Sequence, residues 1–362
     1  MKIALVHDRL TDMGGSERVF QAFAEIFPEA PLYVSIVDHK RIFDFFKDKN
    51  IKTSFLQKLP KFISKSHRNL FFLYPFAFEN FDFSDFNVVL TSTVFAGKGI
   101  ITGSRIKHIC YCHTSTRYFW EFQKDYTANF GKIKKSIYSV LCHWLRIWDF
   151  NAAQRVDNFI ANSKAVQERI KKTYRRDSIV IYPPVRCHEF LPSETNGDYY
   201  LVVSRFVEYK RVDLAIKACN ELGRKLILIG VGQEMKKLRK LAGKTISFVE
   251  NANDEQVKKL MSECRALLFP GEEDFGIVPV EAMSCGRPVI AFGRGGALDT
   301  VIDGKTGVLF GEQTVESLKA AMEKYEAMVF DKLAIREHAL KFDESVFREK
   351  IKEFVEKLRE EG

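Results

Sequence analysis

The sequence predicts an α/β protein made of two doubly wound domains, each with a parallel sheet between layers of helices. The first observation is length, because 362 residues exceed one ordinary hydrophobic core. The second is a regular alternation of short apolar runs with segments of helical periodicity, which is typical of parallel sheets with helical crossovers. The third is that polar or glycine-rich loops follow these runs, at the sheet edge where such folds bind ligands.

Composition indicates a globular protein of a reducing compartment. Hydrophobic residues make up 46% of the chain and charged residues 28%, and no apolar run approaches the roughly 20 residues that cross a bilayer. The N-terminus reaches charged residues too early for a signal peptide. The seven cysteines form no C-x-x-C pair, which argues against a disulfide framework or a zinc ribbon. We therefore expect a cytoplasmic protein.

The positive charge is concentrated in the first half of the chain. Lys and Arg outnumber Asp and Glu by 29 to 19 in residues 1–197, whereas the counts are 27 and 28 in residues 198–362. Such a charge can serve nucleic acid, an anionic membrane surface or a phosphorylated substrate. Nucleic acid is disfavoured because no recognised binding motif accompanies the charge.

The first strand is predicted over Lys2 to His7, before a loop that ends in Gly14 and Gly15 and a helical pattern. The two glycines either allow the backbone to approach a ligand closely or simply form a turn. They are not a dinucleotide fingerprint, because G-x-G-x-x-G is absent from the chain.

Residues 52–78 combine lysines with phenylalanines and contain no acidic residue. Such a segment either lies in a membrane interface beside anionic lipids or packs as an insertion on its own domain. A second segment of this type, residues 132–148, has apolar residues at helical spacing after three lysines, and we interpret it as a helix with a buried face.

His113 is the candidate catalytic residue of the first domain. Further strands are predicted at 88–90, 106–111, 159–161 and 179–182, and His113 directly follows the second of them. The carboxyl end of a parallel strand is where function concentrates, although a lone histidine is more often structural. Asn162 and Ser163 are placed to cap the helix that follows the third strand.

A metal site near His113 is disfavoured. His108, Cys110, Cys112 and His113 lie within six residues, and strand alternation places the first three on one face. Ligands so compressed in sequence rarely close around one metal ion, and short His/Cys clusters are usually strand core.

We predict a first domain over residues 1–185, a linker over 186–197, a second domain over 198–340 and a closing helix over 341–362. Pro183 and Pro184 stop the preceding strand in extended geometry. Ser345 is the expected N-terminal cap of the closing amphipathic helix.

The second domain begins with a strand at 199–203 whose carboxyl end carries Arg205. Lys210 and Arg211 follow near a helix start, where the helix dipole disfavours cations unless an anion offsets them. The loop is therefore interpreted as a phosphate site, with a solvated charged loop as the alternative.

The most informative stretch is F-P-G-E-E-D-F-G-I-V-P-V-E-A-M-S-C-G, from Phe269 to Gly286. It predicts a strand, an acidic loop and a helix that begins near Ile277 and ends before Gly286. Glu273 and Glu281 flank the free N–H groups of that helix start. This is a place to hold a polar ligand that carries phosphate.

This stretch, with G-G-A-L-D-T-V-I-D-G-K-T-G-V-L-F after it, closely resembles the donor-binding half of family 4 retaining glycosyltransferases of the GT-B fold. The resemblance covers most of residues 198–312. The H-D near the N-terminus and the P-P-V at Pro183 to Val185 are similar to the branch that builds O-antigen and other bacterial polysaccharides, often as mannosyltransferases. A GT-B fold implies two Rossmann-like domains facing across a cleft, with the C-terminal helix packing back toward the N-terminal domain.

The resemblance also implies residue roles. Glu273 would bond hydroxyls of the transferred sugar, and Glu281 would accept from the ribose hydroxyls. Arg205 and Lys210 would neutralise the diphosphate. The remaining implied donor-site residues are His113, facing the donor sugar, the backbone of Phe275, Gly276 and Ile277 against sugar and diphosphate, and Gly14 and Gly15, which let the first domain close.

The base-binding loop departs from the family pattern, because this chain has Glu250 before Asn251 where many relatives carry glycine. GDP-mannose is favoured as donor only through the mannosyltransferase likeness, and UDP- and ADP-sugars stay open. The implied acceptor is a glycan or a polyprenyl-diphosphate-linked saccharide. No cofactor or metal is expected, since no D-x-D motif occupies a suitable loop. A non-catalytic GT-B protein that binds nucleotide sugar is the alternative function.

Overall fold

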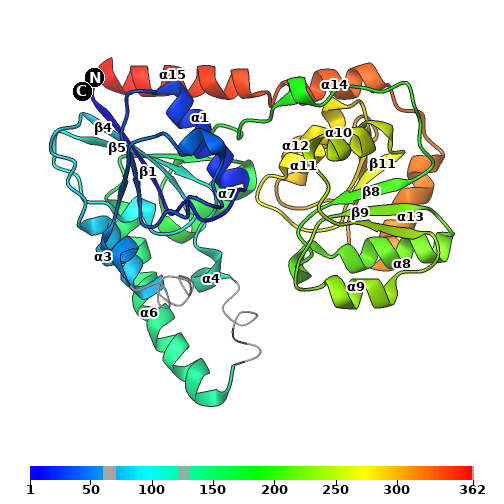
Figure 1. The fold of residues 1–362 in the computed structure, drawn as a ribbon, viewed down its shortest axis with the longest axis horizontal. Helices are drawn as coiled ribbons and strands as arrows, with labels where there is room; N and C mark the ends of the chain where they lie inside the picture. Colours follow the sequence, from blue (N-terminus) through cyan, green and yellow to red (C-terminus); the bar gives the residue numbers. More distant parts are fainter. Residues whose placement is uncertain (60–70, 122–126, 128–129, 361–362) are drawn as a thin grey trace. The chain divides into compact units, whose positions relative to one another are not determined.

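The computed structural model describes residues 1–59, 71–121, 127 and 130–360. Its chain forms two compact units, residues 1–182 with 348–362 and residues 183–347. Each unit contains one all-parallel sheet with helices against it (Figure 1). The predicted fold class, two doubly wound α/β domains, is confirmed.

The first unit has a seven-stranded sheet in the order β3-β2-β1-β4-β5-β6-β7. Its strands are β1 (Ile3–His7), β2 (Leu32–Val34), β3 (Ile51–Thr53), β4 (Val88–Thr93), β5 (Lys107–Cys112), β6 (Asn158–Ala161) and β7 (Ser178–Val180). The predicted strands are all present, but β2 and β3 were missed. Both are only three residues long, too short for alternation to show; β7 is equally short, but its apolar run leads to the Pro183-Pro184 stop.

The helices of the first unit lie on both sides of this sheet, with α1 on one side and α3 and α6 on the other (Figure 1). Ala4 and Val6 of β1 pack in the core beside α3, whereas His7 stacks on Phe20 of α1 at 4.9 Å between ring centroids. The helices are α1 (Gly15–Ile26), α3 (Tyr74–Glu79), α4 (Arg117–Trp120), α6 (Lys132–Gln154) and α7 (Lys164–Tyr174), with 3₁₀ turns η1 (Asp44–Phe46), η2 (Phe55–Lys58), η4 (Phe71–Leu73) and η5 (Gly97–Gly99).

Two predicted helix caps have different outcomes. Ser163 caps α7, because its hydroxyl accepts from the Val166 N–H at 3.1 Å. The predicted cap at Ser345 is wrong. The Asp343 carboxylate instead accepts the Ser345 N–H at 3.0 Å at the start of α15 (Glu344–Glu360), since a side chain before the first turn reaches these free N–H groups better than one inside it.

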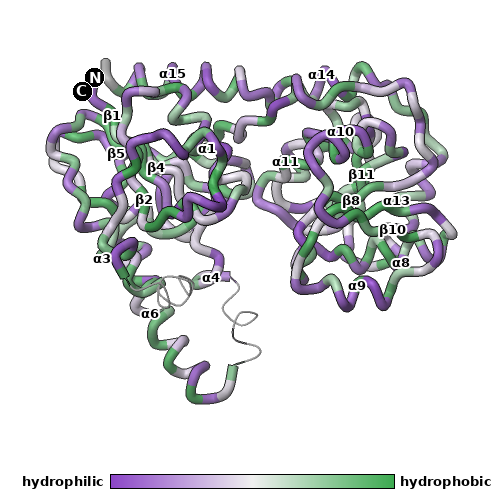
Figure 2. The backbone as a smooth tube through the Cα atoms, in the orientation of Figure 1, coloured by the Kyte–Doolittle hydropathy of each residue, from purple (hydrophilic) through white to green (hydrophobic). Residues whose placement is uncertain are grey.

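The second unit has a six-stranded sheet in the order β10-β9-β8-β11-β12-β13. Its strands are β8 (Tyr200–Val203), β9 (Leu226–Ile229), β10 (Ile246–Val249), β11 (Ala266–Phe269), β12 (Val289–Phe292) and β13 (Gly307–Phe310). The sequence predicted all six, over residues 199–203, 225–230, 246–249, 265–269, 288–292 and 307–310. The strands appear as hydrophobic segments in Figure 2, and residues of all six belong to the buried core, as expected where helices cover both faces of a parallel sheet.

Helices α10 and α11 lie on one side of this second sheet and α8 and α13 on the other (Figure 1). The elements are η6 (Cys187–Glu189), η7 (Glu208–Lys210), α8 (Val212–Leu222), α9 (Met235–Leu241), α10 (Asp254–Glu263), α11 (Ile277–Ser284), α12 (Ala297–Thr300), α13 (Val315–Glu326) and α14 (Lys332–Leu340).

The segment predicted as linker, residues 186–197, is bonded to the second unit. Arg287 donates to the Thr195 carbonyl at 2.8 Å and to Asn196 Oδ1 at 2.7 Å. The C-terminal helix packs on the first unit, where Arg348 forms an ion pair with Glu25 and where Ile351 and Val355 are buried.

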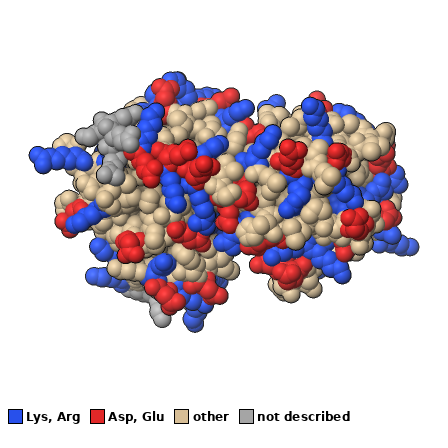
Figure 3. Space-filling model, turned by 90° about the horizontal axis from the view of Figure 1, so that it is seen from above, with Lys and Arg blue, Asp and Glu red and all other residues tan. Residues whose placement is uncertain are grey.

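The described ends of the basic segment 52–78 pack on their own domain. Leu56, Tyr74 and Phe78 are buried in the core cluster, and the Lys52 ammonium lies 4.9 Å from the Tyr33 ring centroid. Residues 60–70, at the centre of that prediction, lie outside the described residues. On the face drawn in Figure 3, basic and acidic side chains are interspersed.

Candidate active site

The second sheet brings two predicted site loops together at its switch point. β8 and β11 are neighbours, although the chain forms β9 and β10 between them. The loops that leave the carboxyl ends of these strands, residues 204–211 and 270–276, therefore emerge side by side. Ligands of doubly wound sheets bind at this place, where the strand order reverses.

An ion pair joins the two loops. The Lys210 ammonium bonds to Glu273 Oε1, and the two side chains are 12% and 23% exposed. The same ammonium lies 5.2 Å from the Tyr209 ring centroid, and Arg205 donates to the Tyr209 hydroxyl at 3.2 Å. The structure thus connects three predicted site residues through Tyr209, which sequence reasoning missed. The only signal for Tyr209 was its place beside Lys210.

Helix α11 begins beside this ion pair, as predicted. Gly276 precedes its first residue and has a φ of 90°, a left-handed conformation that favours glycine. Phe275 is 4% exposed and Glu281, one turn into the helix, is 6% exposed. The first N–H groups of a helix have no partner within it and carry partial positive charge. The region therefore combines a cation, two carboxylates and helix N–H groups.

The glycine-rich turn after β12, to which sequence reasoning gave no role, supports the backbone of Glu273. The Gly296 N–H donates to the Glu273 carbonyl at 2.8 Å. A Cβ atom at Gly296 would lie 2.2 Å from Phe275 Cα, closer than non-bonded atoms can approach. The glycine-rich turn after β12 thus fixes the backbone on which Glu273 and Phe275 sit. Its adjacent glycines were the available signal.

Glu250 and Asn251 follow β10, the outer strand of the sheet, two strands away from β8. Glu250 forms an ion pair with Arg239, and half of each side chain is exposed. Asn251 has a φ of 57°. These residues lie in a polar, exposed loop, and the structure does not show which nucleotide base they would contact.

In the first unit, His113 follows β5 and is 8% exposed. Its Nε2 atom lies 2.8 Å from the Ser92 hydroxyl, and its carbonyl accepts from the Asn162 amide at 3.0 Å. Burial and the neighbouring His7 lower the pKa of His113 to about 3, so the imidazole is neutral at physiological pH.

The N-terminal loop contains a buried carboxylate to which sequence reasoning gave no structural role. Asp8 follows β1 and accepts N–H donors from Val94, Phe95, Ala96 and Gly97 at 2.6–2.9 Å. Burial opposes ionisation, yet the neighbouring His7 and these backbone hydrogen bonds outweigh it and lower the pKa of Asp8. The carboxylate therefore holds the loop after β4 in place.

Gly14 and Gly15 form the start of α1, with Gly14 in extended geometry before the first turn. A Cβ atom at Gly14 would lie 2.9 Å from Glu17 Oε2. Glu17 is buried and lies 3.6 Å from His7 Nε2. Burial raises the pKa of Glu17, but the interaction with His7 and the hydrogen bond donated by the Ser16 hydroxyl outweigh this and bring the pKa to about 2. The predicted glycines thus leave room for an ionised carboxylate.

Acid is expected to destabilise the protein through His113. Between its ordinary pKa of 6.5 and its folded value of about 3, the unfolded chain binds one more proton at this site than the folded chain. Stability therefore falls as pH falls through that window, by about 1.4 kcal/mol per pH unit from this group. In His113→Gln, unfolding followed by tryptophan fluorescence should show a slope shallower by that amount between pH 6 and pH 4.

All three tryptophans, Trp120, Trp144 and Trp148, belong to the first unit, so this signal follows the unit that contains His113. The control is His143→Gln, which removes an imidazole from an exposed position of α6. An unchanged slope in His113→Gln would contradict the assigned neutral imidazole.

The metal interpretation of the β5 cluster gains no support. His108, Cys110 and Cys112 are buried on one face of the strand, as alternation predicts. Burial raises the pKa of Cys110 to about 12 and lowers that of His108 to about 3. Across the described ranges, no group of three or more His, Cys, Asp or Glu side chains is arranged to hold a metal ion.

Comparisons with known proteins identify two family regions. Residues 13–189 match the model of Glycosyltransferase Family 4, and residues 187–339 match that of Glycosyl transferases group 1. An uncharacterized glycosyltransferase of Methanocaldococcus jannaschii is 33% identical over 173 residues, which are 46% of this chain and 49% of that protein. This match therefore spans about half of the relative's length.

A longer match is to the human alpha-1,3/1,6-mannosyltransferase ALG2, at 25% identity over 321 residues, 76% of this chain and 74% of that protein. The match to Dictyostelium discoideum ALG2 has 27% identity and covers 46% of this chain and 52% of that protein. Among solved structures, Anabaena HepE in complex with UDP superimposes with a TM-score of 0.71 at 18% identity, covering 99% of this chain and all of the other. This structural likeness concerns the fold.

Proposed function

Since this chain belongs to the family 4 type of GT-B glycosyltransferases, we propose that it transfers mannose from GDP-mannose to a glycan or lipid-linked saccharide in polysaccharide or O-antigen-type synthesis. The mannosyltransferases among its relatives support the sugar. Those relatives are 25–27% identical to this chain, so donor and acceptor are part of the proposal.

The observation that carries the proposal is the Lys210–Glu273 ion pair at the start of α11. The cation and the helix N–H groups suit a diphosphate, whereas a carboxylate suits sugar hydroxyls. In the absence of donor, Glu273 offsets the charge of Lys210. When donor binds, the diphosphate takes the cation and Glu273 accepts from the sugar.

The proposed reaction breaks the bond between the anomeric carbon and a diphosphate oxygen, and it forms a bond from that carbon to an acceptor hydroxyl oxygen. Negative charge develops on the leaving diphosphate, where Arg205, Lys210 and the α11 N–H groups stabilise it. In a retaining reaction the acceptor attacks on the leaving-group face. Its proton passes to the departing phosphate, so that no separate protein base is required.

We further propose that neither a metal nor a cofactor takes part, because fixed cations and helix N–H groups occupy the place where a metal would act. The first unit, with His113, Gly14 and Gly15, is proposed to serve the acceptor and the transferred sugar. A donor with another base remains the alternative, because the Glu250–Asn251 loop lacks the glycine that many relatives carry.

A donor screen tests this proposal. GDP-mannose, GDP-glucose, UDP-glucose and ADP-glucose are titrated by calorimetry with excess EDTA, and free hexose and glycosylated acceptor are assayed separately. GDP-mannose is expected to bind at least ten-fold more tightly than the UDP- and ADP-sugars, with transfer unaffected by EDTA. Tighter binding of a sugar with another nucleotide would contradict GDP-mannose as the donor, and loss of transfer in EDTA would contradict metal independence. Binding without any transfer would favour a non-catalytic nucleotide-sugar-binding protein.

A further inference from the structure

Helix α6 has a second apolar face that its own unit does not cover. Five large apolar side chains recur along it at intervals of four and three residues, which places them in one stripe of an α-helix. Each is between 44% and 80% exposed. The members of this stripe are Ile133, Ile137, Val140, Trp144 and Ile147.

The stripe lies opposite the face by which α6 packs on the unit. Cys142, Leu145 and Asp149 are the buried side chains of its central turns. At 100° per residue their directions centre about half a turn from those of the stripe. Figure 2 shows hydrophobic residues along α6 well beyond the part that meets the sheet. The predicted buried face exists, but it accounts for only one of two apolar faces.

The exposed charges of α6 are all positive. Lys132, Lys134, Lys135 and Arg146 are its basic residues, and its only acidic residue, Asp149, is fully buried in an ion pair with Lys98. The three lysines are exposed in the first turn, at the end where the stripe begins. An exposed apolar stripe that begins among cations is the pattern of a helix that lies in the interface of an anionic bilayer.

We propose that α6 docks this protein on an anionic lipid surface, with the stripe inserted at the acyl boundary and the lysines against lipid phosphates. Charge favours lipid over a second copy of the chain. If two copies paired through this stripe with parallel helices, their lysine-bearing turns would lie against each other. If the helices were antiparallel, no exposed acidic side chain of α6 would face the lysines. None of the helices within the described ranges is long and apolar enough to cross a bilayer.

Vesicle flotation tests the apolar part of the proposal. Full-length protein is mixed with phosphatidylcholine vesicles, with or without phosphatidylglycerol, at physiological salt. We expect binding to the anionic vesicles and a loss of about 10²-fold in affinity for Ile137→Gln/Trp144→Gln. The matched control is Val329→Gln/Leu333→Gln, which removes two apolar side chains of the second unit that are more exposed than Ile137 and Trp144. Equal loss in both variants would overturn the proposal.

The electrostatic part has its own variant. Lys134→Gln/Lys135→Gln should weaken binding to anionic vesicles by about 30-fold and reduce its dependence on phosphatidylglycerol, with Lys132 retaining part of the attraction. Lys350→Gln/Lys352→Gln removes the same charge from α15, which lies at the other end of the unit in Figure 1, and should have little effect. Binding that is indifferent to lipid charge would count against the proposal.

Fluorescence reports insertion directly, because Trp144 is the most exposed of the three tryptophans. Anionic vesicles should shift its emission to the blue and brominated lipid should quench it. Trp144→Phe should still float but lose both signals. Flotation without any change in Trp144 emission would show charge attraction alone and overturn insertion. A lipid-free dimer in sedimentation that Ile137→Gln/Trp144→Gln dissociates would instead assign the stripe to a second copy.

Discussion

Replacing Glu273 or Lys210 by alanine is expected to reduce sugar transfer by about 10³-fold while the fold persists. For Lys210, a fixed charge that stabilises the leaving group is worth about 10²–10³-fold in rate. For Glu273, the change removes the charge-assisted hydrogen bonds proposed to position the sugar. Each change also leaves its former partner unpaired at a partly buried position. Initial rates with saturating acceptor measure the loss, and thermal unfolding checks the fold. Transfer that survives both changes would defeat the proposed function.

The two variants are expected to differ in what they bind. Lys210→Ala should weaken binding of the free nucleoside diphosphate, because it removes a cation from the proposed phosphate site. Glu273→Ala should leave that binding within a few-fold and weaken only the sugar nucleotide. The matched control is Glu221→Ala, which breaks a 2.8 Å pair with Lys319 between α8 and α13 of the same unit. Water screens such an exposed pair, so its loss should leave both binding and the fold nearly unchanged.

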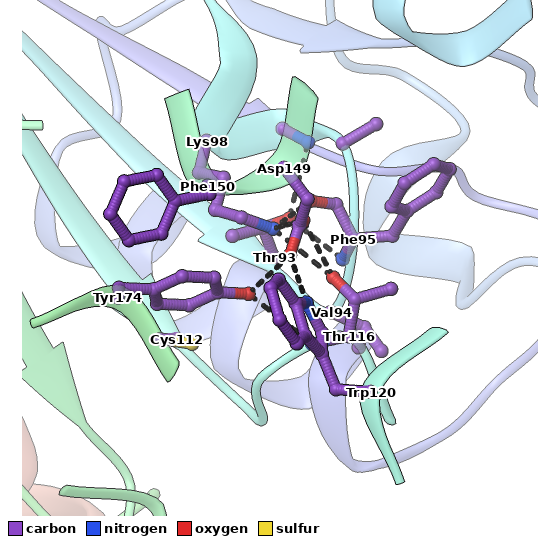
Figure 4. A network of polar contacts seen from close by, with 12 residues as sticks. Thr93, Val94, Phe95, Lys98, Cys112, Thr116, Trp120, Asp149, Phe150 and Tyr174 are labelled. Carbon is purple, nitrogen blue, oxygen red and sulfur yellow. Dashed lines mark hydrogen bonds and ion pairs between the residues drawn. The ribbon is translucent and has the colours of Figure 1, made fainter. Parts of the chain in front are cut away.

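Asp149→Ala is expected to destabilise the first unit by about 3–5 kcal/mol, because it leaves a buried lysine without its counter-ion. Asp149 is fully buried and lies 2.6 Å from the Lys98 ammonium (Figure 4). Its oxygens also accept from Thr116, Trp120 and Tyr174 at 2.8–2.9 Å. Although burial disfavours the charged lysine, Asp149 outweighs this and raises the pKa of Lys98.

Tryptophan fluorescence during urea unfolding measures this loss in the first unit. The matched control is Asp177→Ala, because Asp177 also pairs with a lysine at 2.6 Å but is exposed. Water screens such a pair, so this change should leave the unfolding midpoint nearly unchanged. Lys98→Met/Asp149→Leu should recover much of the lost stability, since an apolar pair of similar volume avoids desolvation. A double variant as unstable as Asp149→Ala would contradict the unpaired-charge explanation.

This buried network also connects segments around the site of the first unit. Lys98 lies in η5 after β4, Thr116 lies three residues after His113, and Asp149 belongs to α6. The Lys98–Asp149 network and the Asp8 carboxylate, which accepts hydrogen bonds from residues 94–97, together hold the loops after β4 and β5 at the carboxyl edge of the sheet. The site of the first unit thus rests on two buried carboxylates that sequence reasoning did not select.

Local patterns were sufficient for most of the fold. The strand runs, the Ser163 cap and the limits of α11 follow from alternation, side-chain capping and the placement of proline and glycine. The short strands β2 and β3 carry too few residues for such a signal. Ser345 was mistaken for a cap because Asp343, two residues earlier, can serve the same N–H group.

The sequence by itself determined the two doubly wound domains, the helix start beside Glu273 and the loop with Arg205 and Lys210. These features depend on residue type and spacing within a few residues. Only the tertiary structure decided that β8 and β11 are neighbours, that Lys210 meets Glu273, and that Lys98 and Asp149 share one buried site. It also decided that α6 leaves one apolar face uncovered. The reason is that strand order and burial arise from contacts between residues far apart in the chain, which periodicity does not encode.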